Sequence, residues 1–305
     1  MNTIKSKHRL EYALLASLGL MARTISDKAA AWAGVRLGDM TFDVFRLRRM
    51  VALDNLSKAF PERPPDEIQD IARSLYRNLG KNLLEFLRFP KLSGEDIKNK
   101  VKFIGQEHLD QAIKGGKGAL LISSHFGNWE LCSSSIAAYG YPLSVVVYEQ
   151  HNPLTDQMMN NIRRAKNLDV IFKPDAPRAI LKALARNRFV AILIDQDAGQ
   201  DGVFVDFMGR PAATAKGPAI FAIRTGAPLL AGVIVRQNDG GHICYIEPPA
   251  YADPANDKEP EILRLTALVT KTMEKYVRKY PDHWYWVHRR WKTQPKQKDS
   301  PLWNV

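Results

Sequence analysis

The chain has 305 residues, of which 45% are hydrophobic and 25% are charged, and these shares exclude a disordered or fibrous protein. Cys132 and Cys244 lie in no CxxC or Cys/His pattern, which argues against a disulfide framework or a structural zinc and fits a reducing compartment. The net charge of +12 predicts an anionic partner, although a solvated basic surface explains it equally well. A nucleic-acid partner is not expected, because no helix-turn-helix, zinc-finger or RNP-like pattern occurs.

The N-terminal segment combines basic and apolar residues. Residues 12–22 carry no charge, but Lys5, Lys7 and Arg9 precede them and Arg23 follows. This run is too short to cross a bilayer, which takes roughly 20 residues, and charges interrupt it too soon for a typical signal peptide. We expect residues 1–40 to form a helix in the membrane interface; the alternative is a buried core helix.

Residues 41–90 also read as helical. A helix is predicted to end near Phe60-Pro61, and the next to begin at Pro64-Pro65-Asp66-Glu67, with proline and acids in its first turn. This second helix ends at Phe89-Pro90. Its apolar residues recur every three or four positions and predict one buried stripe: Ile68, Ile71, Leu75, Leu79, Leu83 and Phe86.

From about residue 101, short apolar runs alternate with helical stretches. The alternation predicts an α/β fold with a mostly parallel sheet flanked by helices. We assign residues 41–292 to this domain and residues 293–305 to a polar C-terminal tail. The expected strands are 119–123, 143–148, 170–172, 190–194, 229–235 and 243–246, and the expected helices are 128–139, 153–167, 176–187, 214–225 and 259–279.

The strand expected at 119–123 leads into His125-Phe126-Gly127-Asn128-Trp129-Glu130. Open α/β sheets bind ligands at the carboxyl ends of their strands. A histidine at that position with a carboxylate five residues later can act as a general base with an orienting partner. No serine or cysteine nucleophile is evident beside it, so the proton is expected to come from a substrate hydroxyl. Alternatively, His125 is a hydrogen-bonded core histidine and Glu130 a surface acid, while Asn128 caps the helix.

Three further clusters are candidate binding residues. Arg163 and Arg164 stand at the end of a predicted helix, where they could clamp a phosphate or simply lie on the surface. Asp195 and Asp197 follow the strand at 190–194. They could orient an arginine, bind a metal or start a turn, but Gln200 replaces the glycine that a calcium loop needs.

The third cluster is residues 203–214, an apolar stretch that contains Gly209 and Arg210 and could line an acyl pocket. The alternative is a strand and turn leading into a helix capped by Thr214. Further on, residues 283–292 crowd tryptophans, histidines and basic residues together. This composition suits a membrane headgroup zone, or else the aromatics close the core.

These motifs together resemble the lysophospholipid acyltransferase superfamily, and within it the late acyltransferases of lipid A biosynthesis, the lauroyl/myristoyl transferase family. The family's HX4D/E motif is matched by His125 and Glu130, its arginine by Arg163 with Arg164 one residue away, and its Asp-x-Asp-x-Gly segment by residues 195–199. Residues 207–214 and 286–292 match two further signatures, and the segment from Asn55-Leu56 to Pro61-Glu62 also fits. The likeness spans nearly the whole chain.

The resemblance implies transfer of an acyl chain from acyl carrier protein to a hydroxyl of an acylated lipid at the cytoplasmic face of the inner membrane. His125 would be the general base and Glu130 its orienting partner, while Arg163 and Asp195 would help to hold the site and a phosphorylated substrate. No cofactor, metal or covalent acyl-enzyme is expected. Many family members carry a longer apolar N-terminal span than this chain, which favours interfacial binding here.

Three alternatives stay open at this point. The acceptor could be another glycolipid or a lysophospholipid, since the resemblance covers relatives of both kinds. The same histidine could activate water, which would make the chain a thioesterase-like hydrolase. A basic protein that binds anionic lipid without turnover is the non-enzymatic reading, and its binding would be indifferent to His125.

Overall fold

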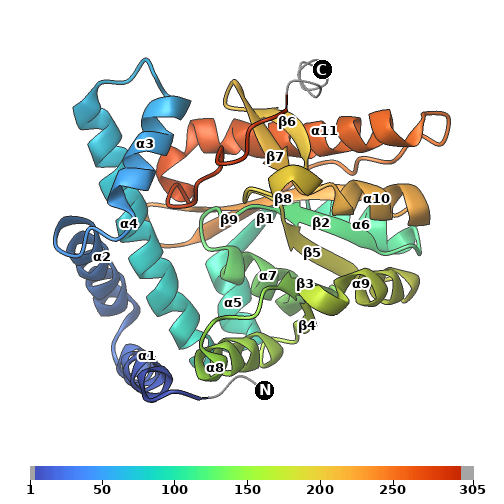
Figure 1. The fold of residues 1–305 in the computed structure, drawn as a ribbon. Coiled ribbons are helices and arrows are strands. Elements are labelled where there is room, and N and C mark those ends of the chain that lie inside the picture. Colours follow the sequence, from blue (N-terminus) through green and yellow to red (C-terminus); the bar gives the residue numbers. More distant parts are fainter. Residues whose placement is uncertain (1–3, 297–305) are drawn as a thin grey trace.

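A seven-stranded sheet lies at the centre of the computed structural model, which describes residues 4–296 (Figure 1). The strand order is β1-β9-β8-β2-β5-β3-β4, and all neighbours are parallel except β8 and β9. The mostly parallel sheet predicted from the sequence is therefore confirmed. Its strands are β1 (Val101–Ile104), β2 (Ala119–Ser123), β3 (Leu143–Val147), β4 (Asp169–Phe172), β5 (Phe189–Leu193), β8 (Leu229–Arg236) and β9 (His242–Ile246).

Helices cover both faces of this sheet, because successive side chains of a strand point to opposite faces. Leu120 and Ile122 of β2 pack in one core with α9, α10 and α11, whereas Ala119 and Leu121 pack in another with α5, α6, α7 and α8. These helices are α5 (Gly94–Lys100), α6 (Gln106–Lys114), α7 (Trp129–Ala138), α8 (Pro153–Arg164), α9 (Ala176–Ala185), α10 (Gly217–Thr225) and α11 (Lys258–Lys279).

The register between β2 and β5 aligns the two segments that follow them. Ser123 is the partner of Leu193, and the Ile194 amide donates to the Ser123 carbonyl at 3.1 Å. Residues two positions beyond this last pair are His125 and Asp195. Because the two strands are parallel neighbours, both side chains emerge at the same edge of the sheet.

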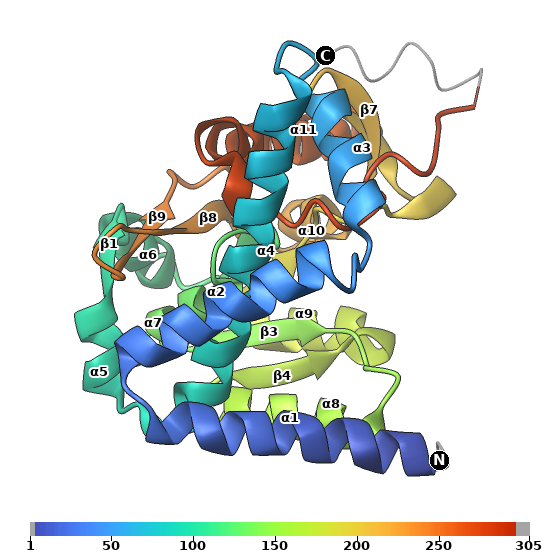
Figure 2. The same ribbon diagram turned by 90° about the vertical axis from the view of Figure 1, so that its left-hand side faces the viewer.

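Four helices form the N-terminal part: α1 (Ser6–Thr24), α2 (Asp27–Asp43), α3 (Arg49–Ala59) and α4 (Pro65–Arg88). The single helix expected at 1–40 is thus two helices, since Ser26 caps α2 by accepting a hydrogen bond from the Ala29 amide. Figure 2 shows α2 crossing α4 obliquely. The crossing is close because it is built on glycines: a Cβ at Gly80 would lie 2.1 Å from the Gly34 carbonyl oxygen.

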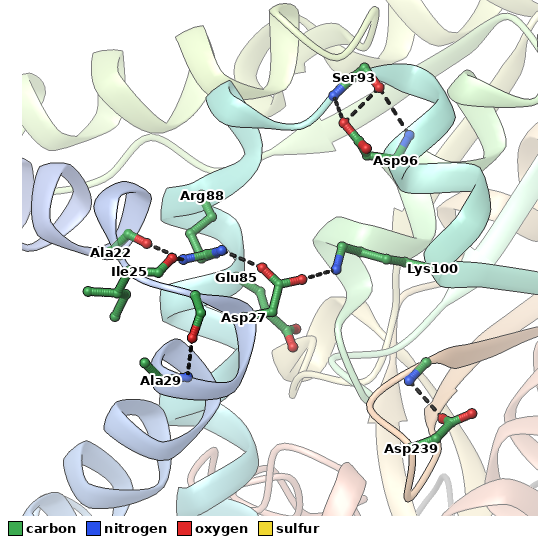
Figure 3. A network of polar contacts seen from close by, with 12 residues as sticks. Ala22, Ile25, Asp27, Ala29, Glu85, Arg88, Ser93, Asp96, Lys100 and Asp239 are labelled. Atoms are coloured by element: carbon green, nitrogen blue, oxygen red, sulfur yellow. Dashed lines mark hydrogen bonds and ion pairs between the residues drawn. The ribbon is translucent and has the colours of Figure 1, made fainter.

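Buried Arg88 fastens the turn between α1 and α2 to the end of α4 (Figure 3). Its guanidinium donates to the carbonyl oxygens of Ala22 and Ile25 and pairs with Asp27, which also pairs with Lys100. Carbonyls at the end of a helix need such donors when they are buried. The N-terminal helices are therefore attached to the α/β domain. No helix within residues 4–296 is long and apolar enough to cross a membrane.

The predicted boundaries of α4 are confirmed, with a 3-10 turn at Phe89–Lys91 after it. Its apolar stripe is buried at Ile68, Ile71, Leu75 and Phe86, but Leu83 is exposed. The sequence missed β1, α5 and α6, all of which are short. It also missed β7 (Arg210–Thr214), which pairs with β6 (Val203–Phe207) as a hairpin.

Thr214 therefore ends a strand and does not cap α10, whose N-cap is Lys216. The Thr214 hydroxyl instead accepts a hydrogen bond from buried Arg290 at 2.6 Å. The pairing of β7 with β6 places Thr214 in a strand.

The tryptophans at 283–292 close a core and do not form a headgroup zone. Trp284, Trp286 and Trp291 are all buried, in a cluster that joins α3, α4 and the β6–β7 hairpin. Asn55 of α3 holds this segment by donating to the carbonyls of Trp286 and His288. Of the predicted tail, residues 297–305 lie outside the described residues.

Candidate active site

His125 and Asp195 form a hydrogen-bonded pair at the carboxyl ends of β2 and β5. The imidazole Nδ1 lies 2.9 Å from Oδ1 of Asp195, and the His125 amide donates to Oδ2 at 2.9 Å. A carboxylate accepts hydrogen bonds, so Nδ1 carries the proton. The Nε2 atom, which has no hydrogen-bond partner among residues 4–296, is then the basic nitrogen.

Asp195 is held as an anion. Its Oδ2 also accepts a hydrogen bond from the Trp284 indole at 2.9 Å. Burial raises the pKa of this carboxyl, but the charge and hydrogen bonds of His125 and the charge of Arg290 outweigh burial and lower it. An ionised carboxylate fixes the ring orientation and stabilises the imidazolium that forms when Nε2 takes a proton.

The pKa of His125 is raised above its ordinary value. Burial lowers it, yet the charge and hydrogen bond of Asp195 and the charge of Glu130 together outweigh burial. The rings of Trp129 and Tyr285 lie 5.1 and 5.6 Å from the imidazole, between centroids. The His125 side chain nevertheless keeps 22% of its surface exposed. The base is thus held in place and still reachable from solvent.

The partner of Glu130 is Arg163, and not His125. Its two carboxylate oxygens meet Nε and Nη2 of Arg163, with 3.1 Å for the Nε contact, and both side chains are mostly buried. Asn160 accepts from Nη1 of the same guanidinium at 2.7 Å. The direct orienting contact predicted for Glu130 is therefore made by Asp195, because the neighbouring strand brings that carboxylate closer. The charge of Glu130 adds to the rise in the pKa of His125.

The structure brings some of the other predicted residues together and leaves others apart. Arg163 faces the site, whereas Arg164 is exposed, since successive helical residues point about 100° apart. The Asp197 amide donates to His288 Nε2 at 3.0 Å, and its carboxylate accepts from Thr293. Gly209 and Arg210 lie at the exposed turn of the β6–β7 hairpin, and no described hydrogen bond or ion pair joins them to His125.

The loop of the HX4E motif rests on a polar network that sequence reasoning missed. Asn82 donates to the Gly127 carbonyl at 2.6 Å, and Asn128 donates to Glu85 at 2.6 Å. Arg236 of β8 binds both Asn82 and Glu85 and completes the network. The sequence shows only local periodicity at these positions and no sign of the network. The residues that they contact lie 43 to 154 positions away.

Backbone bonds fix the same loop. Asn128 caps α7 as predicted, by accepting from the Leu131 amide at 3.0 Å. The Gly127 amide donates to the His283 carbonyl at 2.8 Å and is not free. The first-turn amides of Trp129 and Glu130 make no hydrogen bond among the described residues. Together with the Asn128 amide, which also lacks a partner there, they are available as donors beside His125.

The chain also matches known proteins over nearly its full length. The family model for bacterial lipid A biosynthesis acyltransferase matches residues 4–293. A lipid A biosynthesis lauroyltransferase of Escherichia coli K12 is 28% identical over 86% of this chain and 85% of its own. The palmitoleoyltransferase of lipid A biosynthesis from the same organism is 25% identical over 88% of this chain and 86% of its own.

A third relative has another substrate in its name. A phosphatidylinositol mannoside acyltransferase of Mycolicibacterium smegmatis is 24% identical over 78% of this chain and 77% of its own.

Proposed function

The chain belongs to the bacterial lipid A biosynthesis acyltransferase family, and from this premise we propose that it transfers a fatty acyl chain from acyl carrier protein to a hydroxyl of an acylated lipid A precursor. The observation that carries the proposed mechanism is the His125–Asp195 pair, with its basic Nε2 atom at the carboxyl edge of the sheet. The net charge of +12 supports an acidic carrier as donor and an anionic lipid as acceptor.

Nε2 of His125 takes the proton of the acceptor hydroxyl while the hydroxyl oxygen attacks the thioester carbonyl carbon. A carbon–oxygen bond forms and the carbonyl electrons move onto its oxygen. The first-turn amides of Trp129 and Glu130 support this oxyanion. The carbon–sulfur bond then breaks, and the leaving thiolate takes the proton from Nε2. The acyl group moves directly, so His125 returns to its neutral form without a covalent intermediate.

The remaining residues of the site hold the loop and the substrate. Arg163 and Glu130 are proposed to fix α8 against the start of α7, which places the amides and Trp129. The Asp197 amide is proposed to hold His288 through its Nε2 atom. Exposed Arg164 and Arg210, with the turn at Gly209, are proposed to meet phosphates of the lipid or of the carrier's prosthetic group.

We place the protein at the cytoplasmic face of the inner membrane. The basic N-terminal helices support this proposal, since α1 exposes several large apolar side chains next to Lys5, Lys7 and Arg9. Binding would be interfacial. A different glycolipid acceptor is the second candidate, favoured by the similarity to a phosphatidylinositol mannoside acyltransferase.

The test is mass spectrometry of a lipid A precursor incubated with detergent-solubilised protein and a mixed pool of acyl carrier protein thioesters. A mass gain of one acyl chain supports the proposal and reveals the preferred chain length. Free fatty acid without a gain in lipid mass would favour the hydrolase. A gain only with phosphatidylinositol mannoside, supplied in parallel, would favour the second candidate.

A matched pair of variants ties the reaction to the site. His125→Gln removes the basic nitrogen and is expected to abolish transfer, whereas His108→Gln, in α6, is expected to keep it. Circular dichroism checks that both variants fold. Full activity of a folded His125→Gln protein would contradict the mechanism.

A further inference from the structure

Large apolar side chains are exposed unevenly along this chain. Twelve of them lie within residues 4–50, and only five lie elsewhere among the described residues. Single exposed apolar residues are ordinary, but such a concentration marks an interaction surface. The densest part is the segment between α2 and the first turn of α3, residues 44–50, which we call the basic–apolar loop.

The basic–apolar loop alternates exposed apolar side chains with arginines. Val44, Phe45, Leu47 and Met50 are 70%, 65%, 63% and 74% exposed. Arginines occupy positions 46, 48 and 49, and the loop contains no acidic residue. Leaving four such apolar side chains exposed to water together is energetically unfavourable. Guanidinium groups between them suit phosphates, so an anionic lipid interface satisfies both halves of the pattern.

The loop is held in this form by contacts with α2 and α4. The Tyr76 hydroxyl donates to the Leu47 carbonyl, and Arg49 lies 4.3 Å over the ring of fully buried Phe42. Arg46 and Arg48 adopt left-handed backbone conformations, with φ of 49° and 54°. Side chains other than glycine, asparagine and aspartate rarely do so, and such strain persists where the surroundings enforce it.

The loop lies beside the candidate active site. Leu47 accepts a hydrogen bond from Tyr76, and Tyr285 packs against the core cluster that contains Tyr76. Tyr285 packs against the imidazole of His125. In Figure 2, β3 and β4 point toward the side on which the α2–α3 connection and the amino end of α1 lie. The loop, the amino end of α1 and the carboxyl edge of the sheet, where His125 stands, thus share one side of the molecule.

We propose that the basic–apolar loop inserts Phe45 and Leu47 into an anionic phospholipid bilayer, with Arg46 on the phosphates, and so turns the carboxyl edge of the sheet, where His125 stands, toward the membrane. This inference deepens the proposed function and rests on it for the lipid acceptor. The bilayer is favoured over a protein partner for two reasons. The arginines are interleaved with the apolar side chains, and the loop has no acidic side chain with which to recognise the polar groups of a partner protein.

The test is co-sedimentation of the full chain with vesicles of phosphatidylglycerol and phosphatidylcholine, or of phosphatidylcholine alone. The double variant Phe45→Ser/Leu47→Ser is expected to bind both vesicles about tenfold more weakly or worse. Arg46→Asn keeps a residue that tolerates the left-handed conformation but removes the charge. It is expected to lose about fivefold on the anionic vesicles and little on the neutral ones.

Leu268→Ser is the matched control, an exposed leucine of α11 outside the N-terminal region, and it should bind like the wild type. Equal vesicle binding by the double variant and the wild type would overturn the inference, as would an equal loss in the control or no binding by the wild type.

Acyl transfer separates this inference from the proposed function. The double variant is expected to transfer normally to acceptor in detergent micelles and at least tenfold more slowly to acceptor in vesicles. Equal loss in both would overturn the insertion role. Absence of transfer by the wild type in micelles would instead count against the proposed function, while vesicle binding would still decide the role of the loop.

Discussion

Asp195 lies 70 positions after His125 in the chain, yet its carboxylate accepts hydrogen bonds from both the backbone amide and Nδ1 of that histidine, each at 2.9 Å. The parallel pairing of β2 with β5 produces this contact, because His125 and Asp195 each stand two residues beyond one matched pair of the ladder. The arrangement leaves Nε2 as the basic atom.

Asp195→Asn is expected to lower kcat by about 10²- to 10⁴-fold with little change in KM. The amide keeps the size of the carboxylate but not its charge, so the imidazolium loses its stabilising partner. Steady-state acyl transfer measures the effect. Asp201→Asn, at an exposed carboxylate of a 3-10 turn, is the control and should be unaffected. A wild-type kcat for Asp195→Asn would exclude the pair from the chemical step.

The pH dependence of kcat/KM should show an acid limb with its midpoint above 6.5, the ordinary pKa of histidine. The sign follows from the chemistry: only neutral His125 accepts a proton, and Asp195 favours the protonated form. Activity is therefore lost as pH falls through the raised pKa. In Asp195→Asn the limb should move to lower pH, since burial then acts with less opposition. A limb that stays in place would assign it to another group.

Glu130 and Arg163 should be coupled in stability. Glu130→Ala leaves a mostly buried guanidinium without its partner, at a cost of about 3–5 kcal/mol. Arg163→Met in the same background removes the unpaired charge. The double variant should therefore lose less free energy of unfolding than the sum of the losses in the two single variants. Urea unfolding of all four proteins gives the cycle. Additive effects would show that the pair contributes nothing beyond its separate side chains.

Arg88→Met should loosen the N-terminal helices. The change leaves the buried carbonyl of Ala22 and that of Ile25 without a donor, which costs about 2–4 kcal/mol in total. Hydrogen exchange should rise in α1 and α2 before the sheet is affected.

Lys91→Met is the matched control, because Lys91 also donates to a carbonyl at the end of α1 but is exposed, and its loss should cost under about 0.5 kcal/mol. Equal protection of α1 in Arg88→Met and the wild type would refute the fastening role of Arg88.

The sequence by itself determined the elements whose signals are local. The spacing of Ile68, Ile71 and Leu75 predicted the buried face of α4, and Pro65 and Pro90 marked its ends. Alternating apolar runs predicted a mostly parallel sheet, and the run before His125 placed that residue at the end of a strand. These features depend on neighbours within a turn or a strand, so periodicity records them.

Only the tertiary structure decided which side chains meet. The sequence paired His125 with Glu130 by proximity in the chain, but the order of strands put Asp195 beside the imidazole and left Glu130 to Arg163. Thr214 ends β7, which pairs with β6, and its hydroxyl accepts a hydrogen bond from Arg290, 76 positions away. Such contacts depend on how the strands are ordered and how helices pack on them. That order is set by the packing of the whole core, which no short stretch of sequence contains.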